Sequence, residues 1–200
     1  AAVAAGLHVQ NRYVQWGTAL ADFDNDGLAD LFYVTGHVYP EIERAAGMEG
    51  QYPHKGPRIL FRNAGNSRFA DVSGAGGPGL TTPHSSRGAA FGDFDNDGDV
   101  DALVMNMNEP PSLLRNDSRG GGNWIEVVLD GRASNRAAIG STVIVTVGGR
   151  KQARAVLSQS SYYSHDNVRL HFGLGTASRV DEIDVRRPNA RLALRGLDAV

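Results

Sequence analysis

Short runs of alternating or β-branched apolar residues, broken by clusters that contain glycine, dominate the hydrophobic pattern of this chain. Residues 59–62 and 68–72 have strand character and flank the Gly-containing segment 63–67, so they predict a hairpin. Five further strand-like runs follow residue 122: NWIEVVLD, STVIVTV, KQARAVLSQ, VRLHF and VDEIDV. The pattern predicts an all-β fold of many short strands joined by tight turns.

A near-repeat organises the first part of the chain. WGTALADFDNDGLADLFYVTG, from residue 16, aligns with RGAAFGDFDNDGDVDALVMNM, from residue 87, at an offset of 71. Each copy begins with small residues, continues into an acidic loop and ends in an apolar run. After the second copy, SLLRNDSRGGG is a shorter echo of the hairpin. The variable segment 37–57 has Pro and Gly near both ends, which limits it to one short helix around residues 41–46.

A change of composition at the glycine run 120–122 predicts a domain boundary. Residues 1–119 hold the repeats and both acidic loops, whereas residues 120–200 hold the five later strand-like runs and no acidic loop. We therefore predict a repeat region at 1–119 and a second, small all-β module at 120–200.

The spacing D-x-D-x-D-G-x-x-D occurs once in each copy and indicates a calcium site. Calcium takes six to eight oxygen ligands in loose geometry, and alternate residues of a tightly curled loop can all point inward. Glycine at position 6 permits the sharp turn, position 7 can offer its backbone carbonyl, and position 9 returns a fourth carboxylate. The predicted ligands are Asp22, Asp24, Asp26, Leu28 and Asp30 for one Ca²⁺, and Asp93, Asp95, Asp97, Asp99 and Asp101 for the second.

Three alternatives to two calcium loops can be weighed from the residues. An EF-hand needs an acid at position 12, but Tyr33 and Val104 stand there and the flanking runs are strand-like, so we exclude it. A solvated acidic turn without an ion is the simplest alternative, and two matching copies disfavour it. Magnesium is less suitable, because it retains several waters and uses fewer protein ligands.

The distribution of charge strengthens the case for bound cations. The formal net charge is −2, and eight of the 22 acidic residues lie in the two loops as carboxylate ligands, which leaves 14 acidic against 20 basic residues elsewhere. Two divalent ions would change the net charge to about +2, so the ions are expected to be part of the protein.

Composition also excludes several classes of partner. No basic run predicts binding to nucleic acid or to an anionic membrane, and the chain has no cysteine for disulfides or thiolate sites. The apolar runs are shorter than the roughly 18 residues of a membrane-spanning helix.

Other polar clusters give little support for catalysis. The histidines form no zinc-binding pattern. Serines at 158, 160, 161 and 164 lie near His165 and Asp166, but no G-x-S-x-G motif accompanies them, so we do not expect an enzyme. His165 and His171 are expected to hydrogen-bond within the C-terminal module.

The motifs carry a family resemblance. GDFDNDGDVDALVMN followed by LLRND resembles the FG-GAP/VCBS repeats of integrin-like β-propellers, and NRAAIGSTV, SQSSYYSHDNVRLHFGLG and IDVRRPNARL resemble the ASPIC/UnbV domain. The two in this order resemble the cartilage acidic protein family and its bacterial relatives. The resemblance implies about two propeller-type blades with calcium between strands, followed by a small sandwich-like ASPIC/UnbV module.

A propeller normally has about four to eight blades, so two blades would leave open sheet edges that invite pairing. Further blades or other chains, including copies of this one, are expected to cover them.

The function expected from these features is a calcium-binding, extracellular structural or interaction protein, secreted or at the cell surface. Its partner would be an extracellular protein or a second copy. One alternative is an accessory protein or enzyme of a biosynthetic pathway, because UnbV-type proteins occur near such pathways. Another is a carbohydrate-binding surface module. The start AAVAAGLHVQNRY lacks the pattern of a signal peptide, so an export signal would lie outside these residues.

Overall fold

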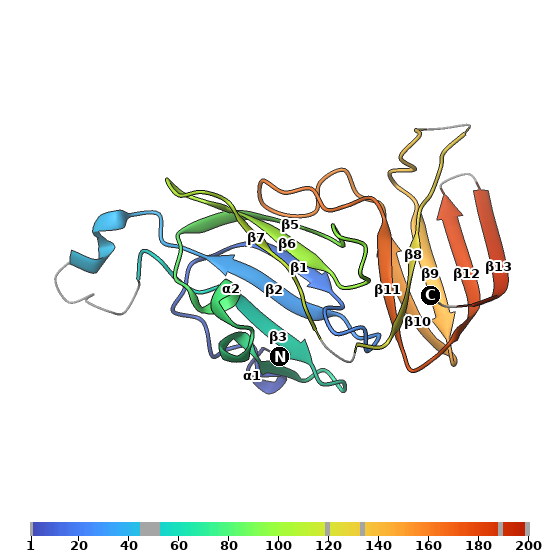
Figure 1. Ribbon diagram of the computed structural model, residues 1–200, viewed down its shortest axis with the longest axis horizontal. Coiled ribbons are helices and arrows are strands. Elements are labelled where there is room, and N and C mark those ends of the chain that lie inside the picture. Colours follow the sequence, from blue (N-terminus) through green and yellow to red (C-terminus); the bar gives the residue numbers. More distant parts are fainter. Residues whose placement is uncertain (1, 45–52, 119–120, 133–134, 188–189, 199–200) are drawn as a thin grey trace.

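The computed structural model describes residues 2–44, 53–118, 121–132, 135–187 and 190–198. The described chain is mostly β, with four antiparallel sheets and a few short helices (Figure 1). These helical elements are α1 (Ala2–Ala5), η1 (Pro40–Arg44), η2 (Ser73–Ala75) and α2 (Pro78–Thr81). The abundance of β-branched runs and glycine turns thus gives the all-β class that the pattern predicts.

Two sheets contain the two copies of the repeat. The first sheet joins β1 (Gln15–Ala21), β2 (Asp30–Thr35), β3 (Ile59–Asn63) and β4 (Phe69–Asp71) in that order. The second joins β5 (Ser86–Gly92), β6 (Asp101–Asn106) and β7 (Ser112–Leu114). The register shifts after Gln15 in one sheet and after Ser86 in the other, which are equivalent positions of the repeat. The repeat is therefore structural, and the predicted hairpin is confirmed as β3 and β4.

An aromatic core joins these two sheets. Phe32 of β2 and Phe91 of β5 approach to 5.3 Å between ring centroids, and Phe23 lies within 6.0 Å of both. On the opposite face of the first sheet, the buried residues Tyr33, Ile59 and Phe61 are covered by Leu7 and Tyr13. The first sheet is thus covered on both faces. Burial of such large side chains is the main source of stability in a fold of this kind.

The C-terminal module has its own core between two sheets. One sheet contains β10 (Arg150–Ala155), β9 (Thr142–Val147), β12 (Arg179–Arg187) and β13 (Ala190–Asp198), and the other pairs β11 (Leu170–Gly175) with β8 (Asn123–Val127). Buried residues of both sheets, among them Val145, Phe172 and Ile183, form one cluster. Figure 1 shows these strands at one end of the elongated molecule.

Several details differ from the sequence prediction. β13 was not predicted, because all its residues are exposed and no buried side chain marks its period. The short helix expected at 41–46 is a 3₁₀ helix from Pro40 to Arg44, and residues 45 and 46 lie outside the described residues. The described strands form stacked sheets, and propeller blades stay a prediction from the resemblance. In the described part of the chain, no helix has the length and apolar character needed to cross a membrane.

Candidate metal centres

Each acidic motif forms the connection between two paired strands. Loop 1 (residues 22–30) joins β1 to β2, and loop 2 (residues 93–101) joins β5 to β6. Ala21 pairs with Asp30, and Gly92 pairs with Asp101. The ninth residue of each motif therefore lies close to the first. As a result, three carboxylates in each loop offer oxygens within 4.8 Å of one another. The triads are Asp22, Asp24 and Asp30 in loop 1, and Asp93, Asp95 and Asp101 in loop 2.

Backbone N–H groups hold both loops in the same curled shape. In loop 1, Asp22 accepts hydrogen bonds from the backbone of Asp26 (3.1 Å) and Gly27 (2.7 Å). Asp30 accepts them from the backbone of Phe23 (3.0 Å) and Asn63 (2.8 Å). Loop 2 repeats all four bonds, with Asp97 and Gly98 donating to Asp93, and Phe94 and Asn116 donating to Asp101. The carboxylates are therefore positioned by the fold itself.

The fifth and sixth positions of the motif have other roles. Asp26 accepts a bond from the backbone of Leu28 (2.7 Å), and Asp97 accepts one from Asp99 (3.0 Å), so these carboxylates stabilise the turn and lie outside the triads. Gly98 at position 6 has φ of 93°, and the glycine of loop 1 has 82°. A residue with a side chain would be strained at this φ, which explains why both motifs have glycine at position 6.

Burial of the triads creates an electrostatic cost that a cation would remove. Burial, together with the charges of the neighbouring aspartates, raises the pKa of Asp22 to about 7 and that of Asp30 to about 6. Burial also raises the pKa of Asp101. Oxygen-only triads in partly closed loops fit a hard divalent cation such as Ca²⁺. The structure thus contains two Asp triads that could hold metal ions.

Sequence reasoning missed an arginine beside each triad. Arg62 Nε lies 2.6 Å from Asp24 Oδ2, and another nitrogen of this guanidinium lies 3.5 Å from Asp26. In loop 2, Arg115 lies 4.0 Å from Asp95 but 2.7 Å from Asp117. The signal was present in the repeat, because both arginines stand in an Arg-Asn pair of the hairpin and its echo.

A buried asparagine connects loop 1 to loop 2 and to the C-terminal module. Asn25, which is 2% exposed, donates from Nδ2 to Gly98 O and to Asp99 Oδ1, both at 3.0 Å. Its Oδ1 lies 2.7 Å from Nε2 of His171, and its backbone oxygen accepts from Gly175 N at 2.8 Å. An amide oxygen can only accept a hydrogen bond, so Nε2 of His171 is the donor. Burial lowers the pKa of His171 to about 4. The expectation that His171 bonds within its own module is therefore wrong.

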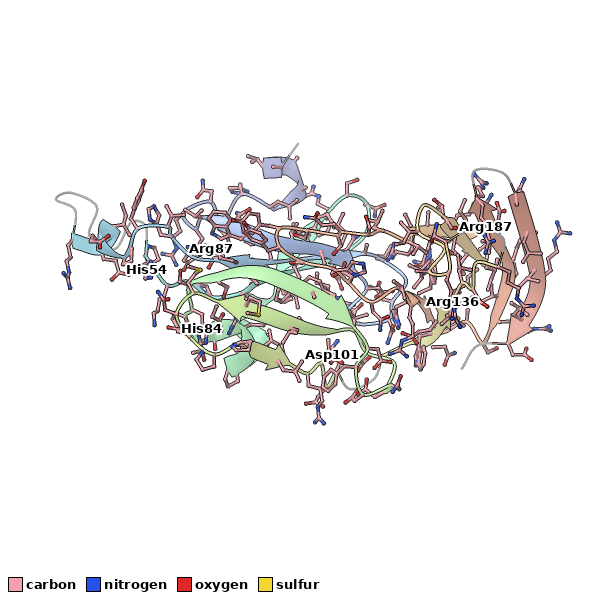
Figure 2. All side chains as sticks on the ribbon, turned by 90° about the horizontal axis from the view of Figure 1, so that it is seen from above. His54, His84, Arg87, Asp101, Arg136 and Arg187 are labelled. Carbon is pink, nitrogen blue, oxygen red and sulfur yellow. The ribbon has the colours of Figure 1, made fainter. Side chains whose placement is uncertain are left out.

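Loop 2 also contacts the C-terminal module. Arg169 donates to Asn96 Oδ1 (2.7 Å) and to the backbone oxygen of Asp93 (2.6 Å). Trp124 packs so closely on Gly98 that a Cβ there would lie 1.9 Å from Nε1. Figure 2 shows Asp101 at the end of its sheet that faces the C-terminal strands. Both triads thus lie where the repeat sheets meet this module.

The serine cluster joins the C-terminal module to the second sheet. Ser164 Oγ accepts from the backbone of Ala89 (2.8 Å), and Asp166 accepts from the backbone of Phe91 (2.9 Å). Ser160 Oγ in turn accepts from the backbone of Asp166 (3.1 Å). These polar groups hydrogen-bond to the backbone, and the bonds of Ser164 and Asp166 connect the C-terminal module to the second sheet.

Comparison with known proteins defines the class of the C-terminal part. Residues 131–193 match the family described as ASPIC and UnbV. The chain therefore carries an ASPIC/UnbV domain, packed against two repeat sheets whose loops hold Asp triads.

Over most of its length, the chain is distantly homologous to cartilage acidic protein 1. It is 25% identical to the Xenopus tropicalis protein over 181 residues and 24% identical to the Homo sapiens protein over 180 residues, each 88% of this chain. The Mus musculus protein is 28% identical over 116 residues, or 58% of this chain. These alignments cover 26%, 25% and 18% of the three relatives, so the chain spans about a quarter of their length or less. The resemblance to the ASPIC/UnbV domain and to the cartilage acidic protein family is confirmed.

Proposed function

We propose that this chain is a calcium-binding structural and interaction protein of the extracellular space, in which two Ca²⁺ ions stabilise the contact between the repeat sheets and the ASPIC/UnbV domain. The observation that carries the proposal is the pair of Asp triads with matching backbone hydrogen bonds, both placed at this contact. Calcium is abundant outside cells, so sites of moderate affinity would stay occupied there.

The role of each ion follows from its surroundings. In loop 1, Asp22, Asp24 and Asp30 would hold it, and in loop 2, Asp93, Asp95 and Asp101. Bound Ca²⁺ supplies positive charge where buried carboxylates otherwise repel one another. The loops would then keep the shape that presents Asn25 and Asn96 to the C-terminal module. We propose no catalytic step.

Thermal unfolding with calcium and with EDTA tests this proposal. Calcium should raise the melting temperature of the unsubstituted chain, because an ion that binds only the folded state stabilises it. Asp24→Asn and Asp95→Asn should each reduce the shift, and Asp24→Asn with Asp95→Asn should nearly abolish it. Asp130→Asn, at a carboxylate that is 60% exposed and outside both loops, is the matched control. An equal melting temperature in calcium and EDTA would contradict a structural role for calcium.

An exposed aromatic cluster favours carbohydrate as a second candidate ligand. Tyr162 packs on Trp16 (4.9 Å between ring centroids) and on Tyr163 (4.5 Å), and Tyr163 is 82% exposed. Tyr163 also has a φ of 47°, which is unfavourable for a bulky residue and is often found at functional sites. Aromatic rings of this kind offer a flat apolar surface to a sugar. Binding on a glycan array that is lost in Tyr163→Ala and kept in Tyr39→Ala would support it.

A further inference from the structure

A cleft lies between the two repeat sheets. Its volume is about 1070 Å³, close to the upper end of the roughly 300–1,000 Å³ that is typical of sites for small molecules. One wall belongs to the first sheet and includes Phe32 and Leu60, and the other belongs to the second sheet and includes Ala102 and Leu114. Leu80 of α2 also lines the cleft. These five apolar side chains are buried or half-buried, so they offer a sheltered surface to a ligand.

The lining changes from apolar to charged beside loop 1. Its charged residues are three aspartates of that loop and two arginines, namely Asp24, Asp26, Asp30, Arg62 and Arg115. The two arginine side chains are 54% and 56% exposed, which places them at the mouth of the cleft. A ligand that matches this lining has an apolar body and a charged head group.

Calcium in loop 1 would reverse the charge at this end of the cleft. The three carboxylates and two guanidinium groups of the lining give a formal charge of −1, which one Ca²⁺ changes to +1. Arg62 Nε lies 2.6 Å from Asp24 Oδ2, and an ion bound by Asp24 weakens this pair and frees the guanidinium for another anion. An anionic head group is therefore favoured when the ion is bound.

The coordination needs of the ion select the type of anion. The triad supplies three carboxylates, whereas Ca²⁺ takes six to eight oxygen ligands. Oxygens from a bound molecule can therefore complete its coordination, and a carboxylate is a hard oxygen ligand that calcium prefers. A carboxylate also pairs well with a guanidinium group such as that of Arg62.

We propose that, with Ca²⁺ in loop 1, this cleft binds an amphipathic carboxylate, whose head group contacts the ion and Arg62 and whose alkyl chain lies between the two repeat sheets. The inference rests on the calcium role proposed above, and it gives loop 1 a second role as part of a ligand site. Among the described residues of loop 2, Val100 alone lines the cleft, so the ion of loop 2 takes no part.

Titration of the isotope-labelled chain with octanoate, followed by nuclear magnetic resonance shifts, tests the site in saturating calcium and in EDTA. Octanoate should bind at least about tenfold more tightly in calcium, because the ion attracts its head group. Butyrate should bind at least about tenfold more weakly than octanoate, since it buries fewer methylene groups, and octan-1-ol should also bind more weakly because it has no charge. Octanoate that does not bind, or that binds equally in calcium and in EDTA, would overturn the proposal.

Two glycines provide a matched pair of substitutions for filling the cleft. Gly79 lines it, and a Cβ added there would lie 3.3 Å from Cδ2 of Leu114. In the described part of the chain, a Cβ on Gly74 would have no atom within 4 Å apart from its chain neighbours. Gly79→Phe should therefore weaken octanoate binding at least about tenfold, whereas Gly74→Phe should leave it unchanged. Equal affinities of these two variants for octanoate would show that the ligand binds elsewhere.

Arg62→Gln separates the ligand site from the ion itself. In saturating calcium this variant should bind octanoate about fivefold more weakly, because the head group loses the guanidinium. Octanoate affinity that is unchanged in Arg62→Gln would contradict the proposed contact. Calcium-dependent melting is measured without octanoate, so a chain that calcium stabilises but that does not bind octanoate loses the ligand site and keeps the calcium role.

Discussion

Loop 1 and loop 2 share one motif and one set of internal hydrogen bonds, but they differ in their surroundings. In loop 1 no residue from 22 to 30 is exposed, and Asn25 is enclosed by loop 2 on one side and by β11 on the other. In loop 2 the four consecutive residues 94–97 are all exposed. Asn96, the equivalent of Asn25, bonds only to Arg169 among the described side chains.

The difference follows from the stacking of the sheets. Loop 2 covers loop 1 in the same way that the second sheet covers the first, because Gly98 and Asp99 of loop 2 accept hydrogen bonds from the buried Asn25 of loop 1. Local sequence therefore fixes how each loop curls, whereas the neighbouring sheet fixes how deeply its carboxylates are buried. Two equal motifs are expected to bind ions with unequal strength and to contribute unequally to stability.

Substitution of the two equivalent asparagines should show the largest contrast. Asn25→Leu removes bonds to Gly98, Asp99 and His171 inside a buried contact, so it should lower the free energy of unfolding by about 3 kcal/mol. Asn96→Leu should cost about 1 kcal/mol or less, since its side chain is exposed. Both residues have φ near 60°, so the backbone cost of leucine cancels in the comparison. Urea unfolding in EDTA measures both, and equal losses would contradict the asymmetry.

Much of this asymmetry could not be predicted from the sequence. The motif correctly predicts that Asp22, Asp24 and Asp30 converge, because their spacing and the glycine turn are local properties. It does not reveal that His171, 146 residues from Asn25 in sequence, lies against loop 1, because that contact depends on how two separate cores pack. β13 was missed for a related reason, since a strand without buried residues leaves no periodic pattern.

The pH dependence of the calcium-free chain should come mainly from loop 1. The pKa of Asp22 in the folded chain is about 7, above its ordinary value of 3.8, so the folded state holds this proton more tightly than the unfolded state. The associated stability is present in full below pH 3.8 and is lost as the pH rises to about 7. About 4 kcal/mol is the upper bound for this loss, and relaxation of the loop should reduce it to roughly 2 kcal/mol.

Unfolding by urea in EDTA, repeated from pH 4 to pH 8, measures this dependence. Asp22→Asn should remove the largest single part of it, because the amide does not titrate, and Asp30 and Asp99, whose pKa values are raised to about 6, should account for most of the remainder. Saturating calcium should reverse the trend, since the ion binds the ionised carboxylates. A calcium-free chain whose stability rises over this range would show that Asp22 is solvated when no ion is bound.

The two arginines beside the triads give the smallest expected contrast. Arg62 lies 2.6 Å from Asp24 and balances part of the charge of loop 1 without an ion, so Ca²⁺ has to compete with it. Arg62→Gln should therefore tighten calcium binding by loop 1 about tenfold, or about 1.4 kcal/mol. Arg115 lies 4.0 Å from Asp95 and is held by Asp117, so Arg115→Gln should tighten loop 2 only about twofold.

Each loop can be titrated with calcium by calorimetry in a chain whose other loop is disabled, by Asp95→Asn for loop 1 and by Asp24→Asn for loop 2. The direction of the change in calcium affinity on Arg62→Gln shows which role Arg62 has. Tighter binding identifies it as a competing cation that makes loop 1 the weaker site in spite of its burial. Weaker binding in Arg62→Gln would show instead that the guanidinium holds Asp24 in place for the ion, and the difference between the loops would then rest on burial alone.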